Sequence, residues 1–443
     1  MAIDPKIFKA YDIRGVYPAE VNEETAYQIG RAFAVYTQTP KIIVGRDIRL
    51  SGPELFTGLT RGLTEQGVDI LDIGLVSTDM FYFACGSTGL GGIIVTASHN
   101  PKEFNGFKLV RQMPELVSGE KIRDLVLAGN FPESSKKGVI TQLEIKDGYR
   151  GKVLSLIDTK KLKPKKIVID PANGLGGAAW DIIKAGLPAE TVPLFYEPDG
   201  NFPNHGGDPL KEENRVDLQK KVIEVKADLG FAIDTDGDRL FAIDGTGAYL
   251  PSDFLGALLA QYLIKRARGG TIVHDAIMGW AVRDLVAASG GKTFTSRVGH
   301  VFIKAEMEKQ NAIFGLEKSG HYYLPDFYWA ETAVGMALLV WEMIDDSGQT
   351  LAQLAAPLRE KYFMSEQINK PVSDPDAIMA RIKEKYHPDF KIEELDGVSI
   401  VAENWHANMR KSNTESLLRL NVEVLGDKAL MEQKRDEFLS FMA

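Results

Sequence analysis

Short apolar runs alternate with amphipathic stretches along most of the chain. The β-branched run KIIVGRD (41–47) is followed by SGPELFTGLTRGLTEQG (51–67). In the second stretch Leu55, Leu59 and Leu63 recur at helical spacing, whereas the first has the composition of a buried strand. A strand followed by a helix, repeated along the chain, predicts an α/β fold.

The alternation divides the chain into units of similar size. A second unit begins at KKIVID (165–170) and ends near FAIDGTG (241–247), and a third contains the apolar helix AVGMALLVWEMI (333–344). From about Phe363 onward, charged helical stretches flank a few strands, which is typical of a small α+β domain. We therefore expect three related α/β domains with mixed sheets and a smaller α+β domain at the C-terminus. The predicted limits are 1–146, 147–248, 249–360 and 361–443.

Composition narrows the class of protein. The 443 residues are 44% hydrophobic and 26% charged, with a net charge of −9. This balance argues against nucleic acid or an anionic membrane as partner, but not against a small anionic substrate in a locally basic cleft. Cys85 is the single cysteine, so an internal disulfide and a multi-cysteine metal site are excluded, and we expect it to pack in a core. With no signal pattern and no apolar segment of spanning length, we expect a cytoplasmic protein.

The most specific motif is DTDGDR (234–239), directly after the apolar run LGFAI. It places Asp234, Asp236 and Asp238 at alternate positions, and a turn at Gly237 lets their carboxylates converge. Converging carboxylates repel one another unless a cation lies among them, and oxygen ligands suit Mg²⁺. The alternatives are a solvated acidic turn and an EF-hand loop, whose sixth and twelfth positions are not matched.

Two glycine-rich stretches imitate nucleotide-binding motifs. Gly174-x-Gly176-x-x-Ala179 resembles a dinucleotide fingerprint, but such glycines more often permit a tight strand-to-helix connection. SGGKT (289–293) would need a glycine at position 286, which is Val286. The sequence supports neither a nicotinamide site nor an ATP site.

TASHNP (96–101) places Ser98 and His99 side by side after an apolar run. Adjacent residues of an extended segment point to opposite faces, so we expect His99 to be badly placed to accept a proton from Ser98. A hydrolase-type pair is therefore not expected.

Three further stretches concentrate groups that bind anions or hydroxyls. RKSNTES (410–416) combines an arginine with small donors and suits a phosphate, although an ordinary polar turn is equally consistent with it. LEKSGH (316–321) offers a carboxylate and a hydroxyl on one turn, which suits sugar hydroxyls. AYDIRG (10–15) and GRDIRLSG (45–52) bring Tyr11, Arg14, Arg46 and Arg49 into the first domain; for Arg46 and Arg49 we expect surface salt bridges.

Together these stretches resemble the α-D-phosphohexomutase family, in particular its phosphomannomutase/phosphoglucomutase branch. AYDIRG, TASHNP with NGFK, NGLGG, DxDGDR, ExSGH and RxSNTE occur in the family's order over essentially the whole chain. The resemblance implies four domains around a central cleft. It also implies interconversion of mannose 6-phosphate and mannose 1-phosphate, together with the glucose pair, through a phosphoserine and a 1,6-bisphosphosugar.

The resemblance also implies roles for individual residues. Ser98 is the expected phosphoserine and joins Asp234, Asp236 and Asp238 around one Mg²⁺. Glu317 and Ser319 are expected to bind sugar hydroxyls, and a hexose 1,6-bisphosphate is the expected activator. The phosphate of the substrate is expected on Arg410, Ser412, Asn413 and Thr414. Positioning or proton transfer is expected of Tyr11, Arg14, His99, Lys108, Arg239, His300 and His321, with Lys108 or His321 favoured as the general base.

Four positions depart from the family pattern. Thr235 and Leu316 stand where glycines are usual, Ser416 where a proline is usual, and Ile277 where a phosphate-contacting lysine is common. A β-carbon at Thr235 requires a negative φ. The alternatives are a phosphoglucosamine mutase, which more often has glycine at position 413, and a catalytically weakened homologue that binds phosphosugars. We expect the protein to be a monomer or a homodimer.

Overall fold

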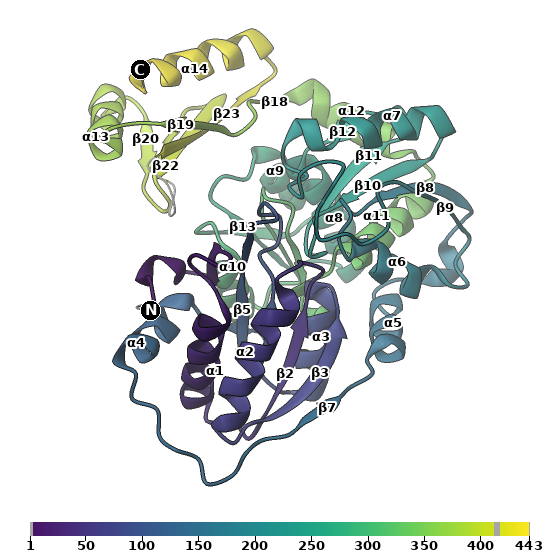
Figure 1. Ribbon diagram of the computed structural model, residues 1–443. Helices are drawn as coiled ribbons and strands as arrows, with labels where there is room; N and C mark the ends of the chain where they lie inside the picture. The colour runs from purple at the N-terminus through teal and green to yellow at the C-terminus, as the bar shows by residue number, and fades with distance from the viewer. Residues whose placement is uncertain (1–2, 412–416, 443) are drawn as a thin grey trace.

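The computed structural model describes residues 3–411 and 417–442, which form four separate sheets (Figure 1). We call the four sheet-centred units domains 1 to 4. Figure 1 shows domain 4 standing apart at one end, joined to the other three through β18 (Tyr362–Met364). Three mixed sheets and one antiparallel sheet confirm the predicted fold class. The domain limits given above stay a prediction.

Domain 1 is built on a seven-stranded sheet in the order β1-β5-β4-β2-β3-β7, with β6 paired to β5. Leu55, Leu59 and Leu63 are fully buried on α2, which confirms the helix predicted from their spacing. The elements are η1 (Pro5–Ile7), β1 (Ile13–Val16), α1 (Glu23–Thr37), β2 (Lys41–Arg46), α2 (Gly52–Glu65), β3 (Asp69–Leu75), α3 (Thr78–Thr88), β4 (Gly92–Val95), β5 (Phe104–Gln112), β6 (Glu115–Leu116), α4 (Gly119–Ala128) and β7 (Ile140–Gln142).

Domain 2 has a five-stranded sheet in the order β12-β11-β10-β8-β9. All five residues of β10 are buried, as expected for a strand covered on both faces. The elements are α5 (Lys146–Leu154), η2 (Thr159–Lys161), β8 (Lys165–Asp170), α6 (Gly176–Lys184), β9 (Ala189–Pro193), η3 (Glu212–Asn214), α7 (Val216–Val225), β10 (Leu229–Ile233), β11 (Leu240–Asp244) and β12 (Tyr249–Leu250).

Domain 3 repeats that topology, with the order β14-β13-β15-β16-β17. In both sheets the first strand pairs in parallel with the next two, and the third strand continues into an antiparallel hairpin. The elements are α8 (Ser252–Ala267), β13 (Thr271–Asp275), α9 (Trp280–Ala288), β14 (Lys292–Ser296), α10 (His300–Lys309), β15 (Phe314–Leu316), β16 (Tyr322–Leu324), η4 (Pro325–Phe327), β17 (Ala330–Glu331), α11 (Ala333–Ser347) and α12 (Leu351–Lys361).

Domain 4 is smaller and wholly antiparallel among its described strands. Its core is a hydrophobic cluster of its own, whereas the largest cluster of the molecule runs through domains 1 to 3. The elements are β18, β19 (Ile368–Pro371), α13 (Pro375–Tyr386), β20 (Lys391–Glu393), β21 (Val398–Val401), β22 (Trp405–Lys411), β23 (Leu417–Leu425) and α14 (Lys428–Phe441). Among the described residues, no helix has the length and apolar character needed to cross a bilayer.

Candidate active site

The backbone of Ser98 is held on both sides in a left-handed conformation. Ser98 follows the end of β4, is 1% exposed and has a φ of 48°. Its N–H donates to Thr96 Oγ1 at 2.9 Å, and its carbonyl accepts from Arg49 Nη2 at 2.6 Å and from the Thr235 hydroxyl. A left-handed serine costs about 1–2 kcal/mol, and these three hydrogen bonds offset that cost.

This conformation overturns the expected placement of His99. The Ser98 Oγ lies 3.1 Å from His99 Nδ1, so the two side chains meet instead of pointing to opposite faces. The expectation was wrong because it assumed an extended backbone at Ser98. Burial and the nearby Arg239 hold the pKa of His99 well below its usual value, so the ring is neutral. The Ser98 Oγ also donates to Asp234 Oδ2 at 3.0 Å.

Asp234, Asp236 and Asp238 converge in the loop that follows β10. Their carboxylates are at most 2% exposed and offer oxygens that lie within 4.8 Å of one another. Gly237 has a φ of 81°, which permits the turn between them. Burial and the two neighbouring carboxylates raise the pKa of Asp234 well above its usual value, because like charges in a buried site disfavour its ionised form.

Lys108 balances part of the negative charge of the three carboxylates. Its Nζ lies 2.7 Å from Asp236 Oδ2 and also contacts Asp238 Oδ2. Burial acts to lower the pKa of Lys108, but the two carboxylates outweigh it and raise the pKa. The second oxygens, Asp236 Oδ1 and Asp238 Oδ1, are buried without a hydrogen-bond partner among the described residues. Buried carboxylate oxygens that accept no hydrogen bond fit a hard divalent cation.

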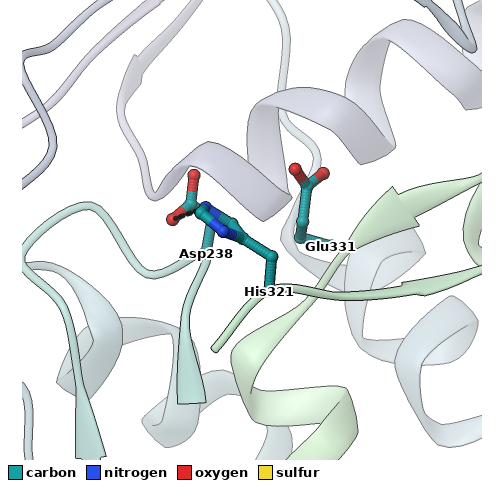
Figure 2. A group of neighbouring side chains, drawn as sticks. All are labelled: Asp238, His321 and Glu331. Atoms are coloured by element: carbon teal, nitrogen blue, oxygen red, sulfur yellow. Dashed lines mark ion pairs between the residues drawn. The ribbon is translucent and has the colours of Figure 1, made fainter. Parts of the chain in front are cut away.

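His321 lies between domains 2 and 3, beside Asp238 and Glu331 (Figure 2). Arg239 Nε donates to His321 Nε2 at 3.3 Å, so the ring proton lies on Nδ1, 2.8 Å from Ser319 Oγ. Burial and Arg239 lower the pKa of His321. Both ring nitrogens therefore already have partners.

Glu317 lies at the end of β15 and is 3% exposed. Its Oε2 accepts from the Gly299 N–H at 3.1 Å, and its Oε1 accepts from the Tyr323 hydroxyl. Burial and the neighbouring Asp275 raise the pKa of Glu317 to about 8. At neutral pH this carboxyl group can donate as well as accept a hydrogen bond.

These groups surround one cavity of about 210 Å³ that receives side chains from all four domains. Asp234, Asp236 and His99 lie behind its wall, against Ser98 and Lys108. Ser412, Asn413 and Thr414 lie outside the described residues. The predicted site residues that line the cavity are Tyr11, Arg14, Ser98, Lys108, Asp238, Arg239, His300, Glu317, Ser319, His321 and Arg410.

Two arginines of this region were not predicted as site residues. Arg49 was expected in a surface salt bridge. It does pair with Asp47, at 3.4 Å, but it is 1% exposed and binds the Ser98 loop. Arg46 forms an ion pair with Asp72, at 3.6 Å. Arg419 lines the cavity and lies opposite Arg410 in the β22–β23 register. The signal for Arg419 is its place on the return strand of the hairpin that carries Arg410.

The dinucleotide-like glycines have a packing role. A Cβ at Gly174 would lie 2.2 Å from the carbonyl oxygen of Thr235, so this glycine lets the loop after β8 approach the acidic loop. Thr235 does not have a positive φ, so the β-carbon that it has in place of the usual glycine is tolerated without backbone strain. Cys85 is fully buried in the core, as predicted.

Comparison with known proteins gives consistent matches over the chain. The phosphoglucomutase/phosphomannomutase models match with α/β/α domain I at residues 5–129, domain II at 147–247, domain III at 251–362 and the C-terminal domain at 368–440. A phosphomannomutase of Salmonella montevideo is 39% identical over 448 residues, covering 98% of each chain. A solved phosphoglucomutase/phosphomannomutase family protein of Burkholderia thailandensis superposes with a TM-score of 0.89 at 29% identity, covering 99% of this chain and 97% of the other. An Aspergillus fumigatus N-acetylphosphoglucosamine mutase, solved with GlcNAc-6P and magnesium, has a TM-score of 0.61 at 15% identity, covering 91% and 83%.

Proposed function

We propose the reaction of this protein from one premise: the chain belongs to the phosphoglucomutase/phosphomannomutase family. It is a mutase, an isomerase-class phosphotransferase, and it interconverts hexose phosphates. The substrates that we propose are mannose 6-phosphate and mannose 1-phosphate, together with the glucose pair. The names of the similar proteins and the asparagine at position 413 support this choice.

One observation carries the proposal. Ser98 is the hydroxyl that opens onto the cavity while its Oγ lies 3.0 Å from Asp234 of the acidic loop. We propose that Ser98 carries the phosphoryl group. The bond between Ser98 Oγ and phosphorus breaks as the free sugar hydroxyl bonds to phosphorus and loses its proton, giving a hexose 1,6-bisphosphate. After the sugar turns end for end, Ser98 Oγ bonds to the other phosphorus as the bond between that phosphorus and its sugar oxygen breaks, and the sugar oxygen takes up a proton.

Asp234, Asp236 and Asp238, with an oxygen at Ser98, would hold one Mg²⁺. When bound, the ion would neutralise negative charge on the oxygens of the phosphoryl group that is transferred. The buried oxygens Asp236 Oδ1 and Asp238 Oδ1, which accept no hydrogen bond among the described residues, support this assignment. A hexose 1,6-bisphosphate would serve as the activator that first loads Ser98.

The other cavity residues bind and orient the sugar phosphate. Lys108 and Arg239 bring positive charge beside Ser98, where it stabilises the transferring group. Glu317 and Ser319 face the cavity and would bind the sugar hydroxyls. The phosphate that is not transferred would lie against Arg410 and Arg419, with Ser412, Asn413 and Thr414 completing its site.

A coupled assay tests the reaction. Mannose 1-phosphate, glucose 1-phosphate and glucosamine 1-phosphate are supplied in turn, each primed with a catalytic amount of the matching bisphosphate. We expect turnover of the first two. A clear preference for the glucosamine compound would favour a phosphoglucosamine mutase, and no turnover of any would refute the proposal in favour of a phosphosugar-binding homologue.

Intact-mass measurement tests the role of Ser98. We expect one added phosphate after incubation with hexose 1,6-bisphosphate, and none in Ser98→Ala. A wild-type protein that never accepts phosphate, or a Ser98→Ala protein that does, contradicts the assignment.

Asp236→Asn tests the metal site. Asparagine can still accept the 2.7 Å hydrogen bond from Thr78 Oγ1, so the fold should persist. The loss of one ligand charge should lower kcat by at least about 100-fold. Activity is measured across a Mg²⁺ titration, with thermal unfolding as the control; wild-type Mg²⁺ dependence in the variant counts against the site.

A further inference from the structure

A fully buried ion pair lies beneath the cavity, outside the groups used so far. Lys304 Nζ lies 2.7 Å from Glu331 Oε2, and the two side chains are 2% and 0% exposed. Lys304 comes from the first turns of α10 and Glu331 from the end of β17. The Lys304 ammonium is packed over the rings of Tyr82 and Tyr323, 4.2 and 5.5 Å from their centroids.

Stability alone does not explain this pair. Removing two charges from water costs several kcal/mol per ion, and apolar residues of similar volume often serve a core as well or better. Tyrosine rings pack against Lys304, whereas Asp238 and His321 lie near Glu331. A methionine and a leucine are close in size to the lysine and the glutamate that they would replace. The neighbours of Glu331 therefore have to explain why this site holds two charged residues.

The neighbour on the cavity side is His300. Glu331 Oε1 lies 3.7 Å from His300 Nδ1, while His300 lines the cavity and its ring meets Tyr11 edge-on at 5.7 Å. A carboxylate beside Nδ1 favours the tautomer with its proton on Nδ1, which leaves the lone pair on Nε2. Lys304 balances the charge of Glu331, so the carboxylate can remain ionised without drawing a proton onto the imidazole.

The other candidates for proton acceptance are already engaged. Lys108 Nζ already pairs with the carboxylates of Asp236 and Asp238. His321 receives the Nε–H of Arg239 on Nε2 and faces Ser319 with Nδ1. Among the described residues, no hydrogen bond is made to His300 Nε2, and His300 lines the cavity.

We propose that Glu331, held in place by Lys304, is a positioning residue that fixes the tautomer and orientation of His300 for proton transfer with the sugar hydroxyl. The inference rests on the proposed function. It assigns Glu331 no contact with substrate. Glu331 also belongs to a cluster with Asp238 and His321 that offers metal-type ligands (Figure 2), but Lys304 already neutralises it, so we assign no second metal there.

The test compares Glu331→Gln with the double variant Lys304→Met/Glu331→Leu, which replaces the ion pair by an apolar pair. Glu331→Gln leaves Lys304 buried without its partner, so we expect a lower melting temperature together with a lower kcat. The double variant removes both charges, so we expect the melting temperature to recover. Its kcat should stay about 10- to 100-fold low with KM within about twofold, because the imidazole has lost its orientation.

A double-mutant cycle with His300→Asn distinguishes a positioning role of Glu331 from a purely structural one. In the His300→Asn background, the Lys304→Met/Glu331→Leu substitutions should lower kcat no further, because the histidine that Glu331 positions is absent. Rates are normalised to the phosphate content of Ser98, so they refer to folded, loaded enzyme. If the double variant does not fold, Glu331→Gln in the two backgrounds decides the same question.

Two results overturn the inference: wild-type kcat in the double variant once stability has returned, or an undiminished loss in the His300→Asn background. Wild-type protein is measured in the same assay. Its failure to turn over hexose phosphates contradicts the proposed function, whereas normal wild-type turnover with either result above contradicts the role of Glu331 alone.

Discussion

Arg49 holds the Ser98 loop through four hydrogen bonds, and Arg49→Lys tests how much this support contributes. The guanidinium is 1% exposed and donates from two nitrogens. Its acceptors are the backbone carbonyls of Ser98 and Asn100, both at 2.6 Å, Phe104 at 2.7 Å and Pro101 at 2.8 Å. A planar fork fixes four carbonyls at once, which a single ammonium nitrogen does not.

The expected loss follows from the geometry. A lysine keeps the charge but presents three donors on one atom, so we expect two or three of the four hydrogen bonds to be lost. At about 1 kcal/mol for each bond, with carbonyls left buried, the free energy of unfolding should fall by about 2–4 kcal/mol. The matched control is Arg46→Lys. The side chain of Arg46 is 25% exposed and its Asp72 ion pair spans 3.6 Å, so the control should cost less than about 1 kcal/mol.

Urea unfolding gives the apparent free energies, and intact mass gives the rate at which Ser98 accepts phosphate from a hexose 1,6-bisphosphate. We expect Arg49→Lys to be less stable and also slower to load, because Arg49 Nη2 fixes the carbonyl of Ser98 itself. If Arg49→Lys and Arg46→Lys unfold at the same urea concentration and load at the same rate, the reasoning is refuted.

Two further predictions concern single buried groups. Thr235→Val should slow the loading of Ser98 about fivefold, corresponding to one lost hydrogen bond of about 1 kcal/mol, while Thr235→Ser should load normally; equal rates would contradict the contact. Asp79 has its pKa raised to about 6 by burial, against a usual 3.8, although Tyr149 and Thr332 donate to it. The folded protein therefore keeps this proton to higher pH than the unfolded chain, so the stability that Asp79 contributes is full below pH 3.8 and is lost as pH rises through 6. The unfolding free energy of Asp79→Asn minus that of wild type should rise by roughly 2–3 kcal/mol from pH 4 to pH 7, and a flat difference between two urea series would refute this.

Features that depend on local periodicity could be predicted from the sequence. The helix that contains Leu55 needs only apolar residues at helical spacing, and the acidic loop needs only alternate carboxylates after a buried strand. Both are properties of a few consecutive residues. Local patterns therefore predicted the fold class and the acidic loop, whereas the resemblance to the phosphohexomutase family supplied most of the residues expected in the cavity.

Features that depend on which strands are neighbours could not be predicted in this way. Arg46 at the end of β2 pairs with Val95 at the end of β4, so the residues after each strand meet at one edge of the sheet. This register brings Arg49 against the Ser98 loop and buries it. A charged side chain suggests a surface position unless its partners are known. The carbonyl partners of Arg49 lie about fifty residues away in the sequence, on a separate loop, so local patterns did not reveal them.

Two of the four departures from the family pattern, Leu316 and Thr235, have partners elsewhere in the fold, which argues against a weakened homologue; Ser416 lies outside the described residues. Leu316 stands where a glycine is usual, but a Cβ at Gly256 of α8 would lie 2.3 Å from Leu316 Cδ1. Gly256, which lacks a side chain, therefore leaves the room that the Leu316 side chain occupies. Thr235 likewise replaces a glycine, yet its hydroxyl binds the Ser98 carbonyl, so the change adds a contact to the acidic loop. Ile277 is buried and brings no charge, but five cationic side chains line the cavity that would receive an anionic substrate: Arg14, Lys108, Arg239, Arg410 and Arg419.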